Sequence, residues 1–438
     1  MSRGWVVTLA GTGINLALGI LYTWSVIRKA IPGDWGWSDK QKQLPYAIAC
    51  LVFSIMMVPA GRLQDKISPR WVASICGLLV GAGMIFASFG DNSNLFYLVG
   101  FGVLAGAGIG FGYASATPPA VKWFPAARTG MIVGIVVSGF GLASVWAAKA
   151  TDWLTNSYGV PSTMFTLGVA FLIVVVLLAQ LLRTPPKGYV PPGSPPPGSG
   201  AAVKKENSSP VEMPPKGYAP PGSLPLGSGA AVKKENFSPT EMLATWQFYL
   251  LWFMYACGAG AGLMIISNLA SLADDQAGLK LGFVLVAWLA VGNGAGRILA
   301  GTLSDKLGRK PTLMGCLLFQ AVLMVVLTQA TKESALATMP AMALLSALIG
   351  ANYGANLALY PSITKDYYGL RNFGVNYGLV FTAWGVGGFA LPLLAGWLKD
   401  RYQVYSYACF VAATLLVVAA VVTLLVRPPH AAHQEPAA

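Results

Sequence analysis

Twelve apolar stretches, each long enough to cross a lipid bilayer as one helix, constrain the fold of this chain more than any other feature. A spanning helix needs roughly 20 mostly apolar residues. Only 10% of the residues are charged, whereas a soluble domain carries roughly 25%. We therefore predict an all-α polytopic membrane protein with spans near 4–27, 43–63, 71–90, 95–117, 129–151, 161–183, 246–272, 281–303, 311–331, 337–361, 374–396 and 404–426.

A polar segment rich in Pro, Gly, Ser and Lys separates the sixth stretch from the seventh. It contains two similar copies in tandem, 185–213 and 214–242, with a period of 29 residues. A segment of this composition cannot bury a hydrophobic core and is expected to be disordered. The sequence thus predicts four regions, which are an N-terminal six-helix bundle (1–183), a disordered cytoplasmic linker (184–243), a C-terminal six-helix bundle (244–429) and a tail (430–438).

A loop motif recurs at the same place in each half. GRLQDKISPR (61–70) follows the second stretch and GTLSDKLGRK (301–310) follows the eighth, and both read G-x-x-x-D-K-x-x-x-[RK]. Orientation by positive charge alone would give basic residues but no repeated Gly and Asp. We interpret the motif as a conformational element built from Gly61, Asp65, Arg70, Gly301, Asp305 and Arg309.

With this motif and its two halves, the chain resembles the major facilitator superfamily. The resemblance implies two pseudo-symmetric bundles around a central cavity, with alternating access by rocking. The motif would then be cytoplasmic and would stabilise one conformation. Lys and Arg are more numerous on the motif's side of the spans, mainly because of the linker. This bias predicts cytoplasmic termini and, in a prokaryote, insertion in the inner membrane.

The sequence offers no evident enzyme chemistry. It has no phosphate-binding loop, and its two histidines, His430 and His433, lie in the tail. The five cysteines lie in apolar stretches without metal-ligand spacing. Every Asp and Glu lies in a loop, in a tail or near the end of a span. We predict no enzymatic activity, cofactor, metal or nucleic acid partner, and we attribute the net charge of +13 to membrane orientation.

Arg297 is the outstanding charge, because it lies inside the apolar sequence LVAWLAVGNGAGRILAG. An arginine at the centre of a span costs at least ~2.5–3.5 kcal/mol. No Asp or Glu occurs between Asp275 and Asp305, so we expect an anionic substrate to neutralise it. Asn293 lies one turn earlier and is expected to orient the guanidinium or to bind substrate. The alternative is structural, with Arg297 capping carbonyl groups or pairing with a loop carboxylate across the bundle.

Tyrosines and amides of other spans are expected to complete this site. The span near 337–361 carries Asn356 and Tyr360 on one stripe with Tyr353 beside it, and the spans near 4–27 and 95–117 carry Tyr22 and Tyr113. Packing between helices, or anchoring at the membrane interface, is the alternative role for such residues.

A narrower resemblance concerns monocarboxylate porters and the oxalate/formate antiporter group. RGWVV (3–7) and KWFPAARTGMIVGIVVSGFG (122–141) resemble porter signatures, and YPSITKDYYGLRNFGVNYG (360–378) resembles the antiporters. Both groups keep an arginine that falls on Arg297. Porters place an acidic residue one turn before this arginine, where this chain has Asn293. Antiporters keep a lysine in the span that matches 374–396, where this chain has Trp384. One buried cation favours a monocarboxylate over oxalate.

We therefore expect a secondary active transporter of small monocarboxylates such as lactate or pyruvate, working by proton-coupled symport. Without an acid inside a span, the proton would travel with the substrate or use Asp274 or Asp275 at a loop end. One alternative is an exchanger of the oxalate/formate type. Another is a non-transporting sensor that signals through its linker.

Overall fold

The computed structural model describes residues 2–125, 129–186, 189, 191, 236–369 and 372–429, without the side chains of residues 65, 66 and 129–131. Helix is the only regular secondary structure in these ranges. Within a bilayer a helix satisfies all of its own backbone polar groups, which favours this arrangement. The elements are α1 (Arg3–Leu18), η1 (Gly19–Thr23), α2 (Trp24–Ala30), η2 (Gly33–Trp35), α3 (Asp39–Lys66), α4 (Pro69–Ser88), α5 (Asn94–Tyr97), η3 (Leu98–Ala105), α6 (Gly106–Val121), α7 (Thr129–Ala179), α8 (Pro239–Leu243), α9 (Trp246–Asp275), α10 (Gly282–Leu307), α11 (Arg309–Thr328), α12 (Met339–Tyr368), α13 (Phe373–Tyr402) and α14 (Ser406–Leu425).

Eleven helical segments of the described residues are long and apolar enough to cross a membrane. The longest element, α7, consists of two helices joined at Gly159, whose φ of 77° lies in a region that glycine tolerates best. The predicted spans 129–151 and 161–183 both lie on this element, and the other predicted spans coincide with the other segments. The predicted all-α membrane fold is confirmed.

Two spans change helix type along their length. The first span passes from α1 through the 3-10 segment η1 into α2, and the fourth contains the π-helical segment η3 before α6. Such irregular stretches inside a helix often mark a hinge or a functional site. Tyr22, a predicted site residue, lies in η1.

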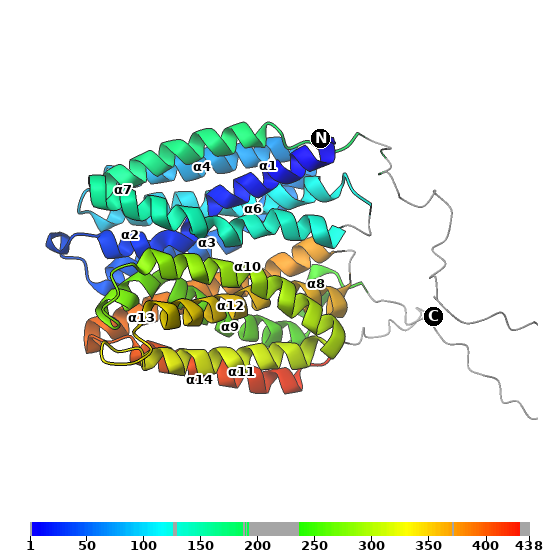
Figure 1. The fold of residues 1–438 in the computed structure, drawn as a ribbon. Helices are drawn as coiled ribbons and strands as arrows, with labels where there is room; N and C mark the ends of the chain where they lie inside the picture. The colour runs from blue at the N-terminus through cyan, green and yellow to red at the C-terminus, as the bar shows by residue number, and fades with distance from the viewer. Residues whose placement is uncertain are drawn as a thin grey trace, which may run out of the picture.

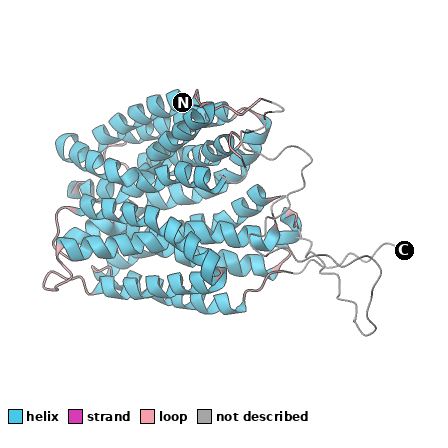
Figure 2. Ribbon diagram, turned by 45° about the vertical axis from the view of Figure 1, so that its right-hand side comes forward, coloured by secondary structure: helices cyan, strands magenta, loops and turns pink. Residues whose placement is uncertain are grey.

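The helices form two groups that lie side by side. Figure 1 shows α1 to α7 in one group and α9 to α14 in the other, with the start of α1 and the end of α14 at the same end of the molecule. Figure 2 shows the same two groups from another side. Across the interface α3 packs along α13, and α7 packs against α10. These contacts, together with those of α2 with α9, form the interface between the groups.

Glycines set the close approach of α10 and α12. A Cβ added at Gly292 or Gly296 would lie 1.9 Å from the carbonyl oxygen of Ala347 or Ala351, respectively. A glycine of α12 makes the corresponding contact with α10, since a Cβ added at Gly354 would lie 2.1 Å from the carbonyl oxygen of Asn293. Small residues four apart allow this kind of backbone contact between spanning helices. The contact fixes Arg297 on α10 relative to the tyrosines of α12.

The division into four regions stays a prediction. Most of the tandem repeat, 192–235, and the end of the tail, 430–438, lie outside the described residues. The described chain resumes at residue 236 and enters the short helix α8, where Ser238 and Glu241 form a reciprocal capping box. The predicted disorder of the linker is therefore not addressed by the described structure.

Candidate functional site

A small cavity lies between the two groups of helices, beside Arg297. Its volume is about 10 Å³, which is room for about one water molecule. One group contributes residues from η1, α3, α6 and α7, and the other contributes residues from α10, α12 and α13. The lining residues are Tyr22, Phe53, Tyr113, Phe140, Arg297, Leu357, Phe381 and Trp384. A bound organic acid would require side chains that line this cavity to move.

Arg297 is half-buried and has no carboxylate within ion-pairing distance in the described part of the chain. Its Nε donates to Oδ1 of Asn293 at 3.2 Å, and its Nη1 donates to the carbonyl oxygen of Val137 at 3.4 Å. The second distance exceeds the usual range for a nitrogen donor. Of the structural alternatives, a weak carbonyl contact is present and a carboxylate partner is absent among these residues.

The surroundings of Arg297 leave hydrogen-bonding capacity unused. Asn293 is fully buried, and its Nδ2 has no partner in the described structure. Gly141 of α7 faces this pair, since an added Cβ would lie 3.6 Å from both Nη2 of Arg297 and Nδ2 of Asn293. A buried donor without an acceptor beside a half-buried cation is an environment suited to an anion.

The predicted tyrosines divide into two sets. Tyr22 and Tyr113 line the cavity with Arg297. Tyr353 lies behind the lining residues, and its hydroxyl is 2.7 Å from that of Tyr22. Tyr360 is fully buried away from the cavity and stacks on Tyr255 with ring centroids 4.1 Å apart.

Asn356 also lies away from the cavity. Its Nδ2 donates to the carbonyl of Asn352 at 2.9 Å, and its Oδ1 is buried without a partner in the described residues. An added Cβ at Gly258 of α9 would lie 2.7 Å from this Oδ1. Asn356 therefore faces α9, whereas Leu357, its neighbour in sequence, lines the cavity.

Sequence reasoning did not select the apolar walls of the cavity. Phe53, Phe140, Leu357 and Phe381 line it, and nothing in a spanning segment distinguishes such residues from ordinary core. Trp384 entered the sequence argument as the residue that replaces a lysine, and it forms another wall of the cavity. Its indole Nε1 donates to the hydroxyl of Tyr353 at 2.8 Å.

The loop motif lies at the end of the molecule where the chain begins. Arg309 pairs with Asp305 at 2.7 Å and with Asp366 at 3.1 Å, and it also donates to Ser304. The Arg70 guanidinium lies over the ring of Trp71. The side chain of Asp65 is not described, and a Cβ added at Gly61 or Gly301 would meet no atom within 4 Å.

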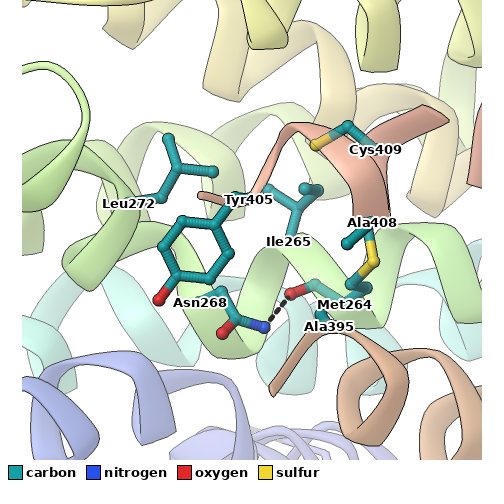
Figure 3. A pocket seen from close by; sticks show the side chains of 8 residues that line it. All are labelled: Met264, Ile265, Asn268, Leu272, Ala395, Tyr405, Ala408 and Cys409. Atoms are coloured by element: carbon teal, nitrogen blue, oxygen red, sulfur yellow. Dashed lines mark hydrogen bonds between the residues drawn. The ribbon is translucent and has the colours of Figure 1, made fainter. Parts of the chain in front are cut away.

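A second polar cluster closes the opposite end. Arg28 is 1% exposed and donates to Asp39 at 2.6 Å, to Tyr405 at 3.0 Å and to Asn268. Figure 3 shows Asn268 of α9 and Tyr405, which directly precedes α14, in a pocket at this end. Burial raises the pKa of the Tyr405 hydroxyl, so it stays protonated at neutral pH.

That pocket is filled by side chains, so it has no room for a ligand. At the same end Lys29 pairs with Asp274 at 3.1 Å, and the backbone N–H groups of Asp39 and Lys40 donate to Asp400. These contacts join the two groups of helices away from the central cavity.

Comparison with known proteins identifies relatives along nearly the whole chain. The chain is 25% identical to the oxalate:formate antiporter of Oxalobacter formigenes, covering 94% of this chain and 90% of that protein. It is 25% identical to the uncharacterized MFS-type transporter YhjX of Escherichia coli, covering 87% and 85%. Human monocarboxylate transporter 11 is 29% identical over 38% of this chain and 35% of its own length.

A solved structure agrees with the fold. The bacterial homolog of the human lysosomal transporter Spinster, in an inward-facing and unoccupied conformation, superposes with a TM-score of 0.68 at 18% identity, covering 97% of both chains. The family model of the Major Facilitator Superfamily matches residues 5–292 and 251–438. The chain belongs to the major facilitator superfamily.

Proposed function

We propose that this protein is a secondary active transporter of small monocarboxylates, such as lactate or pyruvate, that works by alternating access. The supporting observation is Arg297, a half-buried cation without a carboxylate partner in the described residues, at a cavity between the two groups of helices. Two proteins related to this chain are named as an oxalate:formate antiporter and a monocarboxylate transporter.

A substrate carboxylate would complete the site around Arg297. The planar guanidinium matches a carboxylate with two parallel hydrogen bonds, an arrangement that an ammonium group cannot make. Neutralising the cation removes the cost of keeping a charge between the closing bundles. The aromatic walls, including Phe53, Phe140 and Phe381, would limit the substrate to a small acid.

The number of cations at the cavity favours a monoanion. Among the described residues, Arg297 is the only charged one that lines it, and Trp384 occupies the position where the antiporter resemblance places a lysine. A dianion such as oxalate would keep one unpaired charge in a low-dielectric environment, which is costly.

Proton symport is the coupling we propose, and exchange of one carboxylate for another is the second candidate. Exchange is favoured by the match to the oxalate:formate antiporter over 94% of this chain. Symport would need a proton that travels with the substrate or through Asp274 or Asp275, which are paired with Lys29 and Lys399 respectively.

Thermal stabilisation of the purified protein by a panel of carboxylates tests the substrate class. A ligand that binds the native state raises the apparent stability, so lactate and pyruvate should raise the melting temperature more than oxalate. Uptake into proteoliposomes then tests the coupling. A pH gradient that leaves the rate of lactate uptake unchanged would exclude symport, and counterflow insensitive to a protonophore would favour exchange.

A further inference from the structure

Three hydrogen-bonding side chains form a chain that ends at the cavity. The indole Nε1 of Trp384 lies 2.8 Å from the hydroxyl of Tyr353, which lies 2.7 Å from the hydroxyl of Tyr22. All three side chains are at most 2% exposed. Trp384 and Tyr22 line the cavity with Arg297, whereas Tyr353 does not. The chain links α13 and α12 of one group of helices to η1 of the other.

The chemistry of these groups gives the chain a direction. An indole N–H is a donor only, so the oxygen of Tyr353 accepts from Trp384. Either direction of the Tyr353–Tyr22 bond leaves one hydroxyl proton unpaired. We assign Tyr353 as the donor, because the unpaired proton is then on Tyr22, which lines the cavity, and not on Tyr353, which does not. The proton of Tyr22 is left without an acceptor in the described structure and is free to point into the cavity.

We propose that Trp384 and Tyr353 are positioning residues that make Tyr22 the second hydrogen-bond donor to the substrate carboxylate. Arg297 binds one carboxylate oxygen and Tyr22 binds the other. This inference rests on the proposed function and adds to it how the anion is oriented. Each donor in the chain polarises the next, so Tyr22 donates more strongly than an isolated phenol.

The same chain connects substrate binding to the position of the two groups of helices. Tyr22 comes from the first group, and Tyr353 and Trp384 come from the second. A carboxylate that accepts from Tyr22 strengthens the Tyr353–Tyr22 hydrogen bond across the interface. Because a ligand shifts a conformational equilibrium by its difference in affinity for the two states, the bound anion favours the state in which these tyrosines touch.

Tyr353→Phe gives the sharpest test, because it removes one hydroxyl behind the cavity and leaves the ring in place. We expect lactate to bind about tenfold more weakly, as measured by titration of thermal stabilisation. Tyr22→Phe should weaken binding by at least the same factor. The double variant should be no weaker than Tyr22→Phe alone, because Tyr353 acts through Tyr22.

Trp384→Phe supplies a second variant, and Trp252→Phe is the matched control. Trp384→Phe should weaken binding about threefold in the wild type and leave affinity unchanged in Tyr22→Phe. Trp252 makes the same kind of bond, from its indole Nε1 to Thr382 at 2.9 Å, but lies away from the cavity. Trp252→Phe should therefore bind lactate with wild-type affinity.

The outcomes separate this inference from the proposed function. If the wild type binds lactate, Arg297→Ala does not, and Tyr353→Phe binds with unchanged affinity, the positioning role is wrong and the transport proposal stands. Losses that add in the double variant would also overturn the positioning role, because they indicate independent structural effects. If the wild type binds no carboxylate, the proposed function itself is wrong.

Discussion

Two arginines of the spans differ in how their charge is neutralised. Arg28 is 1% exposed and has Asp39 at 2.6 Å, with Tyr405 and Asn268 as further acceptors. Arg297 is half-buried and contacts Asn293, a distant backbone carbonyl and the hydroxyl of Tyr113, with no carboxylate partner among the described residues. A buried cation with a carboxylate partner is part of the protein's own structure, whereas one without a carboxylate is available to a ligand.

The comparison assigns a structural role to Arg28 and, under the proposed function, a substrate-binding role to Arg297. The Arg28 cluster joins helices of both groups at one end. Arg297 lies at the cavity between them, next to Tyr22 and Tyr113. Variants of the two arginine sites should therefore fail in different measurements.

Arg297→Ala should have the largest effect. We expect substrate binding to be lost while the protein still inserts in the membrane, because the guanidinium has no ion pair in the described structure to lose. Arg297→Lys should bind poorly, since a point charge lacks the planar fork. Thermal stabilisation by lactate and uptake into proteoliposomes measure both effects. Normal uptake by Arg297→Ala would refute the site.

Asp39→Asn should lower stability and leave the affinity for lactate unchanged. Removing the charge that faces Arg28 should cost about 1–3 kcal/mol, seen as a lower melting temperature of the protein without ligand. Asp34→Asn is the control, because Asp34 is exposed and pairs with no basic residue in the described chain. Equal melting temperatures for the two variants would remove the structural role assigned to the Arg28 cluster.

Lys29→Gln should have a smaller effect that depends on salt. Lys29 and Asp274 are 29% and 37% exposed, and pairs of this kind contribute roughly 0.2–1 kcal/mol. The difference in melting temperature from wild type should shrink as ionic strength rises. A difference that persists at high salt would show that this pair behaves like the buried Arg28–Asp39 pair.

Deleting one repeat copy, 185–213, should have the smallest effect. Tyr189 of the first copy packs against Trp123 with ring centroids 5.1 Å apart. The deletion brings Tyr218 of the second copy to the equivalent position after Arg183. Uptake should therefore stay within about twofold of wild type if the segment is a tether. A larger loss would support the sensor or regulatory alternative for this segment.

Much of the fold could be predicted from the sequence, because the bilayer restricts spanning segments to helices of similar length. The repeated motif at 61–70 and 301–310 indicated two related halves. The residues of the candidate site were harder to predict from the sequence than the fold. Arg297 stood out because charge is costly in a span, and Tyr22 and Tyr113 were among several aromatic residues with equal claim.

Asn356 and Tyr360, predicted on one stripe, show what helical periodicity cannot predict. Helical periodicity places residues on one face, but it does not tell which neighbour that face meets. In the structure Asn356 lies against α9 and Tyr360 stacks on Tyr255. The apolar lining of Phe53, Phe140 and Phe381 carried no signal at all, because such residues are common in every span.

The sequence by itself determined that this chain spans the membrane in two helical halves and that a lone cation lies among apolar residues, since hydrophobicity and charge act locally. Only the tertiary structure decided which side chains surround that cation. Glycine contacts between α10 and α12 and the packing of α3 on α13 bring Tyr22, Arg297 and Trp384 to one cavity. Those contacts join residues far apart in the chain, so no local pattern could specify them.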